Sequence, residues 1–186
     1  MELRGKNILI TGTTRGIGLA TALLLGKKKC NVFVWNRVMP QLPDKVDVLI
    51  NNAGIYFTSP FEHTSLLDWE KAFETNVTLP FVLIKTLLRE NRFNPEFSVI
   101  LNVNSWDIER HPVQQIAYNC SKAALHELTL SLGRELYIRH ILVTEIVLPT
   151  VRTDMLLKVN KANPLPKKII SMREAARRIW QLLRQI

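Results

Sequence analysis

The sequence has little of what marks several large classes of protein. Only two of its 186 residues are cysteine, Cys30 and Cys120, so we expect no disulfide framework and a cytoplasmic location. No apolar run approaches the roughly 20 residues of a membrane-spanning helix, and the first residues, MELRGKNILITG, lack the layout of a signal peptide. Hydrophobic residues at 47% and charged residues at 22% exclude a disordered chain and a collagen-like repeat.

Metal-ligand spacing is also missing. The four histidines are scattered, and the sequence contains neither an H-x-x-x-H pattern nor closely paired cysteines. Because zinc sites place their ligands at such short spacings, we expect no metal site.

Acidic residues are scarce at the C-terminal end. The chain carries 25 basic and 16 acidic residues, for a net charge of +9, but residues 152–186 alone hold nine basic and two acidic ones. The basicity is therefore mainly a property of the last fifth of the chain. Arg173, Arg177, Arg178 and Arg184 lie opposite an apolar stripe on the last predicted helix. The simplest interpretation is that these arginines form the solvent-exposed face of the helix. The less favoured alternative is that they bind nucleic acid or a phosphate-rich substrate.

Short apolar runs alternate with helical segments along the chain. This alternation predicts an α/β fold, a Rossmann-like doubly wound parallel sheet with helices on both faces, in one domain of residues 1–186. Ligands bind such sheets at the carboxyl ends of the strands. The predicted strands are Lys6–Thr11, Asn31–Trp35, Val46–Ile50, Ser98–Val103 and Ile141–Leu148, and the predicted helices are Gly16–Lys29, Leu66–Asn91 with a break or kink at Pro80, Ile116–Leu136 and Ser171–Leu183.

A glycine-rich turn follows the first predicted strand. Residues Thr11–Gly18 read TGTTRGIG and lead into a helix. Such a turn lets the backbone approach a pyrophosphate and presents the N–H groups of the helix N-terminus to it. A plain turn between a strand and a helix is the other interpretation, and the motif alone leaves both open.

Tyr118 and Lys122 lie four residues apart on a predicted helix and therefore share a face. A phenol with its normal pKa of about 10 is a poor base at neutral pH. A nearby cation favours the phenolate, lowers that pKa and makes the group usable for proton transfer. Taken alone, the pattern is better explained by a surface tyrosine and lysine, because such pairs are common on helices.

The order of four motifs carries more information than any one of them. TGxxxGIG follows the first strand, NNAG follows a later core strand, Ser105 ends SVILNVNS, and YxxxK begins thirteen residues after that serine. This arrangement resembles the short-chain dehydrogenase/reductase (SDR) family, classical type, over about residues 6–153. The resemblance implies an oxidoreductase that transfers a hydride between a nicotinamide dinucleotide and a carbonyl or secondary alcohol.

The resemblance also implies roles for individual residues. Tyr118 would pass the proton, Lys122 would lower the Tyr118 pKa and bind the nicotinamide ribose, and Ser105 would hydrogen-bond the substrate oxygen. Asn76, at the helix irregularity near Pro80, would hold a water in the proton relay. The implied cofactor-binding residues are Gly12, Thr13, Arg15, Gly16, Ile17, Gly18, Asn36, Arg37, Asn52, Ala53, Gly54, Tyr118, Lys122, Pro149, Val151 and Thr153.

Charge after the second strand bears on the choice of cofactor. An acidic residue there selects the ribose 2′-OH of NAD, whereas arginine accommodates the 2′-phosphate of NADP. Here the strand is followed by Asn36 and Arg37, and Arg15 lies inside the glycine turn. Because arginine binds phosphate bidentately, these residues favour NADP over NAD. The alternative is that both arginines are solvated surface residues.

The chain is shorter than the family pattern in two places. Only nine residues separate Arg37 from Asp47, too few for a further helix and strand. Nine extended residues reach about 30 Å, enough to run back along a strand and pass over its neighbour. We therefore expect a sheet without the usual third strand unit, in the order 2-1-4-5-6 by the family's strand count, and without the last strand. The acid that would follow the lost strand beside the adenine is missing, with Asp44 or Asp47 as the available substitutes.

Two further expectations concern partners. A homodimer, if formed, would use the helices that contain Asn76–Arg89 and Tyr118–Leu136. The two shortened regions also motivate a rival hypothesis, a non-enzymatic Rossmann module that senses a dinucleotide or binds a partner. The presence of Asn76, Ser105, Tyr118 and Lys122 argues against it.

Overall fold

Five parallel strands form the centre of the fold. The structure, a computed structural model, describes residues 1–35, 42–159 and 169–186. The strands pair in the order β2-β1-β3-β4-β5, which confirms the predicted α/β fold. Among the residues just named, no strand lies outside β2 and none follows β5. Their bounds are Asn7–Thr11 (β1), Asn31–Trp35 (β2), Val48–Asn51 (β3), Ser98–Ser105 (β4) and Ile141–Leu148 (β5).

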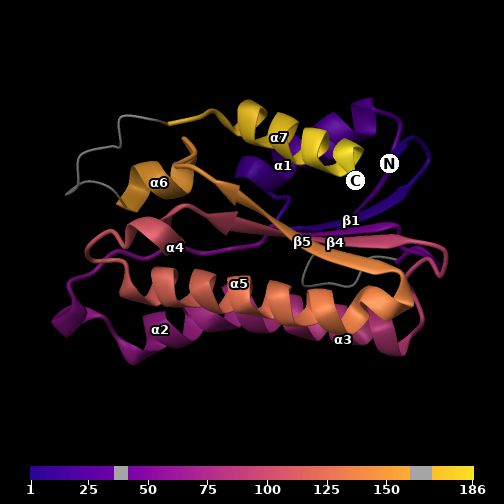
Figure 1. Cartoon of the computed structure of the whole chain (residues 1–186). Coiled ribbons are helices and arrows are strands. Elements are labelled where there is room, and N and C mark those ends of the chain that lie inside the picture. The colour runs from indigo at the N-terminus through magenta and orange to yellow at the C-terminus, as the bar shows by residue number, and fades with distance from the viewer. Residues whose placement is uncertain (36–41, 160–168) are drawn as a thin grey trace.

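Helices cover both faces of the sheet (Figure 1). Helices α1 (Gly16–Lys27) and α7 (Met172–Gln185) pack on one face. The opposite face carries α2 (Leu66–Phe73), α3 (Leu79–Arg89) and α5 (Ile116–Leu136). The predicted Gly16–Lys29 and Ser171–Leu183 helices shift by one or two residues at their ends, and the predicted Ile116–Leu136 helix has the observed bounds. The sheet is therefore doubly wound.

Alternate residues of the strands supply two apolar cores. Ile8 and Ile10 of β1 belong to the core beneath α1 and α7, whereas Leu9 belongs to the core beneath α3. All four residues of β3 are buried, as expected for a central strand covered on both faces. This packing fixes which strand residues face each helical layer.

The segment predicted as one helix broken near Pro80 consists of two helices joined by a wide turn. A π-helical turn, Glu74–Thr78, separates α2 from α3, and Pro80 lies in the first turn of α3. Proline has no N–H to donate to the carbonyl four residues earlier, and a π turn is one way a helix absorbs such a gap. Asn76, in the middle of this turn, is fully buried.

The connection from β2 to β3 contains no strand in the part that the structure describes. Leu42 packs with Phe33 and Trp35 of β2 against the core beneath α3. Val46 forms a short parallel bridge with Phe93 just before β3 begins. The connection thus reaches the start of β3 at the amino end of the sheet, as the predicted direct crossing requires.

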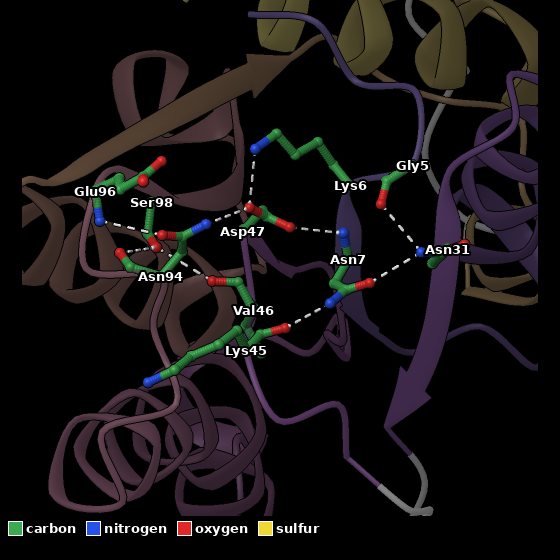
Figure 2. Close-up of polar contacts among 10 residues, drawn as sticks. All are labelled: Gly5, Lys6, Asn7, Asn31, Lys45, Val46, Asp47, Asn94, Glu96 and Ser98. Carbon is green, nitrogen blue, oxygen red and sulfur yellow. Dashed lines mark hydrogen bonds and ion pairs between the residues drawn. The ribbon is translucent and has the colours of Figure 1, made fainter.

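A carboxylate fixes this entry into β3 (Figure 2). Asp47 accepts hydrogen bonds from Lys6 Nζ at 3.1 Å, from the Asn7 backbone N–H at 2.8 Å and from Asn94 Nδ2 at 2.9 Å. Burial opposes its ionisation, but the three hydrogen bonds lower the pKa of Asp47 below its usual value. Asp44 and Asp47, the substitutes that the sequence makes available for the adenine-side acid, lie elsewhere in the structure. Both lie before β3 begins, away from the carboxyl end of the sheet, and Asp44 faces Arg92.

Short elements that the sequence did not predict lie near the ends of these strands and helices. Helix α4 (Asp107–Arg110) follows β4, and α6 (Asp154–Val159) follows β5. Single 3₁₀ turns form at Phe61–His63 and Tyr137–Arg139. In Figure 1, α4 and α6 lie together at one end of the sheet.

Candidate active site

A cavity of about 720 Å³ opens at the carboxyl ends of the strands. It lies where the segments that follow β1, β3, β4 and β5 meet, which is the usual ligand position in a doubly wound sheet. Most of the residues predicted from the sequence line it: Gly12, Arg15, Gly16, Ile17, Asn52, Ala53, Gly54, Ser105, Tyr118, Lys122, Pro149, Val151 and Thr153.

The other predicted site residues have different positions. Asn36 and Arg37 lie outside the described residues. Thr13 is buried, and its neighbour Thr14 lines the cavity instead. Gly18 and Asn76 are buried behind the cavity wall, so they contribute to the site by holding other residues.

Two glycines of the turn after β1 are required by close packing. Gly12 has φ +70°, and a Cβ there would lie 2.7 Å from the Ala53 Cα. A Cβ at Gly18 would run into the Gly12 carbonyl oxygen. The turn therefore packs directly on the segment that follows β3.

Hydrogen bonds join the same two segments. The Thr11 hydroxyl accepts from the backbone N–H groups of Asn52 and Ala53 at 3.0 and 2.9 Å. The Asn52 Nδ2 donates to the carbonyl oxygens of Thr11 and Gly12 at 2.9 and 3.1 Å. The NNAG motif thereby holds the glycine turn in place at the cavity wall.

The N-terminus of α1 is the part of the cavity best suited to an anion. Arg15 is the N-cap residue, and no side chain caps the helix. The first-turn N–H groups of an uncapped helix lack intrahelical partners and carry the positive end of the helix dipole. Because Gly16 and Ile17 of this turn line the cavity, the residues present fit a pyrophosphate.

Three predicted catalytic side chains meet at the cavity wall. The Lys122 Nζ lies 5.9 Å from the centre of the Tyr118 ring and donates a hydrogen bond to the Val103 carbonyl oxygen at 2.8 Å. The side chain of Ser105, at the end of β4, hydrogen-bonds the Tyr118 phenol. The Tyr56 ring meets the Tyr118 ring edge-on, with 5.0 Å between the ring centres.

The pKa values of this cluster differ from the sequence-based expectation. Burial raises the pKa of the Tyr118 phenol well above its ordinary value, the Ser105 hydrogen bond opposes this rise, and the charge of Asp107 adds to it. Burial also lowers the pKa of Lys122 to about 8, against the charge of Glu145. The net pKa of Tyr118 is therefore raised in this structure because desolvation dominates, and the predicted lowering of that pKa by Lys122 stays a prediction. Tyr118 is protonated at neutral pH and has a proton to donate.

Asn76 connects the catalytic helix to the segment after NNAG. Its Oδ1 accepts from the Ile55 N–H at 2.9 Å, and its Nδ2 donates to the Ile55 carbonyl at 3.0 Å and to the Ser121 Oγ at 2.9 Å. Ser121 directly precedes Lys122. The side chain of Asn76 therefore fixes α5 next to Lys122, and its predicted role in holding a water stays a prediction.

Several cavity residues were not identified from the sequence. Tyr56 follows the NNAG motif, and Asp107 and Arg110 lie on α4. Burial raises the pKa of Asp107 above its usual value, against Arg110 and the Ser105 hydrogen bond. Met155 and Leu156 of α6 supply apolar lining. Asp107, Arg110, Met155 and Leu156 reach the cavity from the short helices α4 and α6. The sequence gives no periodic signal for helices this short.

Two kinds of feature are missing from the part of the chain that the structure describes. No three His, Cys, Asp or Glu side chains there form a group that could hold a metal ion. No helix among the same residues has both the length and the apolar character needed to cross a bilayer.

Comparisons with known proteins agree with the fold and the motifs. The family model for short chain dehydrogenases matches residues 34–164. The chain is 30% identical to a 3-oxoacyl-(acyl-carrier-protein) reductase of Aquifex aeolicus over 83% of this chain and 77% of that protein. It is 28% identical to the 2,3-dihydro-2,3-dihydroxybenzoate dehydrogenase of Escherichia coli over 73% and 65% of the two chains.

Solved structures show the same fold. A 3-ketoacyl-(acyl-carrier-protein) reductase from Brucella melitensis, complexed with NADH, aligns with a TM-score of 0.81 and 22% identity over 97% of this chain and 91% of that chain. A short chain dehydrogenase from Burkholderia cenocepacia, complexed with NADP, aligns with a TM-score of 0.83 and 21% identity over 99% and 86%. The family model and the Aquifex relative go further than the fold, and they show that this chain belongs to the short-chain dehydrogenase family.

Proposed function

We propose that this chain, acting as a single domain of residues 1–186, transfers a hydride between NADP(H) and a carbonyl or secondary alcohol. The observation that carries the proposal is the meeting of Ser105, Tyr118 and Lys122 in the cavity that the glycine turn also lines. Proton transfer and dinucleotide binding thus share one site. Membership of an oxidoreductase family supports the same conclusion.

The chain would hold the dinucleotide along the carboxyl ends of the strands. The uncapped N-terminus of α1 would bind the pyrophosphate through its backbone N–H groups. The backbone of Asn52–Gly54 would line the central groove, and Pro149, Val151 and Thr153 would bound the far end. When bound, the nicotinamide supplies or accepts the hydride.

Tyr118 would supply the proton in the reductive direction. Its raised pKa keeps the phenol protonated at neutral pH, so it can donate to the oxygen that gains negative charge as the carbonyl is reduced. Ser105 would hydrogen-bond the same oxygen. The Lys122 ammonium would stabilise the phenolate left behind. In the oxidative direction the same phenol would act in reverse, starting as the phenolate and accepting the proton.

The preference for NADP rests on two arginines. Arg15 lines the cavity and is exposed. Arg37 is the second residue after β2 in the sequence. Arginine at these two sequence positions would supply guanidinium donors to a 2′-phosphate. We expect calorimetry to show tighter binding of NADPH than of NADH, and Arg37→Asp to weaken NADPH binding selectively. Unchanged NADPH binding by this variant would contradict the assignment.

We also propose a homodimer through the outer faces of α3 and α5. Phe81 and Val82 on α3 and Leu130 on α5 are between 46% and 51% exposed, and burying such side chains against a second copy would be favourable. Sedimentation analysis should give a dimer that Leu130→Glu and Phe81→Glu convert to a monomer. A wild-type monomer at micromolar concentration would contradict this proposal.

The reaction itself can be tested by following the hydride. The protein is incubated with NADPH that carries deuterium at both C4 positions, and with a panel of ketones, aldehydes and 3-oxoacyl thioesters. We expect at least one panel member to be reduced, with deuterium on the new carbinol carbon. Tight NADPH binding without oxidation by any panel member, or a product without deuterium, would contradict the proposed reaction.

A further inference from the structure

A carboxylate lies behind the predicted catalytic residues, in a position that the proposed reaction does not use. Glu145, in the middle of β5, is only 15% exposed at its side chain. Its Oε2 accepts a hydrogen bond from the Asn104 Nδ2 at 2.8 Å, and its Oε1 lies 2.7 Å from the His126 Nδ1. One carboxylate thus contacts both β4 and α5, the two elements that carry Ser105, Tyr118 and Lys122.

Asn104 transmits this contact to two catalytic residues. It is buried at the end of β4, and its Oδ1 accepts from the backbone N–H of Ser105 at 2.9 Å. Its Nδ2 donates both to Glu145 and to the backbone carbonyl of Lys122, the latter at 3.2 Å. Rotation of the Asn104 amide would break the bond to Ser105 and the bond to Lys122 together.

His126 supplies the second attachment. It follows Lys122 by one turn of α5, so both residues lie on the same face of the helix. This face packs on β4 and β5, where Asn104 and Glu145 lie. The carboxylate therefore holds α5 at two successive turns, directly through His126 and through Asn104 at Lys122.

We propose that Glu145 is a positioning residue for the predicted catalytic site: it fixes Asn104 between Ser105 and Lys122 and places its negative charge beside the turn of α5 that carries Lys122. The proposal rests on the proposed function, because it assigns Glu145 a role in that same site. Two consequences follow: the hydrogen bonds of Glu145 position Asn104, and its charge acts on Lys122. The variants below are chosen to keep the hydrogen bonds and to test the effect of the charge.

The electrostatic consequence depends on the charged groups around Lys122. Besides Lys122, the ionisable groups at this end of the described structure are Tyr118 and His126 on α5, Tyr56 after β3, Asp107 and Arg110 on α4, Glu145 on β5, and Arg15 and Asp154 at the cavity. The π turn contributes the neutral Asn76. Burial lowers the pKa of Lys122, and the charge that opposes this lowering is that of Glu145. Without this charge, a larger fraction of Lys122 would be neutral in the range where the enzyme works.

Glu145→Gln separates charge from shape. The glutamine Oε1 can still accept from Asn104, and its Nε2 can donate to a neutral His126, so the hydrogen bonds remain while the charge is lost. Glu127→Gln is the matched control. Glu127 lies on α5, next to His126, but it is exposed and hydrogen-bonds only to Ser131 among the described residues. Both variants remove one negative charge from the molecule.

His126→Lys tests the same idea without altering the buried residue. The His126 side chain is 42% exposed, so a lysine there can be accommodated if Glu145→Gln does not fold. Its ammonium would pair with Glu145 and offset the field of that carboxylate at Lys122. We expect the same direction of effect from both variants.

Two measurements are made on each folded variant. Nuclear magnetic resonance of ¹⁵N-lysine-labelled protein, with Lys122→Arg to assign the signal, gives the Lys122 pKa directly and needs no substrate. The pH profile of kcat for NADPH oxidation gives the alkaline limit of activity. In Glu145→Gln and His126→Lys we expect both to move down by at least about half a pH unit, with Glu127→Gln unchanged.

The outcomes distinguish this proposal from the proposed function. A lowered Lys122 pKa in a protein that reduces no carbonyl would support the electrostatic role of Glu145 and contradict the proposed reaction. An active enzyme whose Lys122 pKa and alkaline limit are the same in wild type and Glu145→Gln would overturn the role of Glu145. A uniform loss of activity at every pH, with the Lys122 pKa unmoved, would also overturn it, because that result indicates a structural role only.

Discussion

Asp47→Asn should destabilise the fold at the point where the chain enters β3 after its direct crossing. Three donors surround the two carboxylate oxygens: Lys6 Nζ and Asn94 Nδ2 at Oδ1, and the Asn7 N–H at Oδ2. Asparagine offers one oxygen and one NH₂ group. Whichever way the amide turns, at least one of the three donors faces another donor and loses its partner.

The size of the effect follows from these contacts. Hydrogen bonds to a charged group contribute about 1.5–3 kcal/mol each. The Lys6 side chain is 38% exposed, so its ion pair adds only up to about 1 kcal/mol after screening by solvent. Loss of the charge and of at least one bond should therefore lower the free energy of unfolding by about 2–3 kcal/mol. For a domain of this size, that corresponds to a fall in melting temperature of about 4–12 °C.

Acid should remove the difference between the two proteins. The pKa of Asp47 is lowered in the folded state, so its contribution is complete above the unfolded value of about 3.9 and is lost as the pH falls through the folded value. Urea unfolding at pH 7 and at a series of pH values below 4 measures this. Asp44→Asn, at a fully exposed position, is the control and should leave the unfolding midpoint unchanged. Equal stability of wild type and Asp47→Asn at pH 7, or a deficit that persists in strong acid, would refute the reasoning.

Three further predictions concern the cofactor and the catalytic lysine. Gly18→Ala places a methyl group against the Gly12 carbonyl and should weaken NADPH binding, measured by calorimetry, at least about tenfold. Gly26→Ala is the control, because the space around Gly26 is open, and it should leave the affinity unchanged. Equal NADPH affinities of the two variants would contradict the packing argument. Arg15→Ala should weaken NADPH binding more than NADH binding, and equal losses would remove Arg15 from phosphate recognition. Because the pKa of Lys122 is about 8 and the charged form is needed, reductase activity should fall above about pH 8; a constant rate to pH 10 would contradict this role.

Much of the fold could be predicted because its signals are local. Apolar runs marked each strand, and the few residues between Arg37 and Asp47 excluded a further helix and strand, which agrees with the observed order of the sheet. The missing N–H of Pro80 predicted an irregular helix, although the type of irregularity, a π turn with a buried Asn76, depends on tertiary packing.

The site was predictable in its membership and less so in its electrostatics. The motifs named residues that line one cavity, because parallel strands bring their carboxyl ends together. The direction of the Tyr118 pKa was not predictable from its spacing to Lys122, since it depends on how far the phenol is buried. The role of Glu145 depends on the pairing of β4 with β5, which sets Glu145 opposite Asn102 and within reach of Asn104, and no local pattern reveals that register.

Comparison of Tyr118→Phe with wild type tests the central claim most directly. Phenylalanine keeps the ring and its contact with Tyr56 but removes the proton that the account assigns to the reduced oxygen. With a carbonyl substrate and saturating NADPH, kcat for NADPH oxidation should fall by about 10²–10⁴-fold, while calorimetry gives an NADPH affinity within a few-fold of wild type. A Tyr118→Phe protein that oxidises NADPH at the wild-type rate would contradict the account.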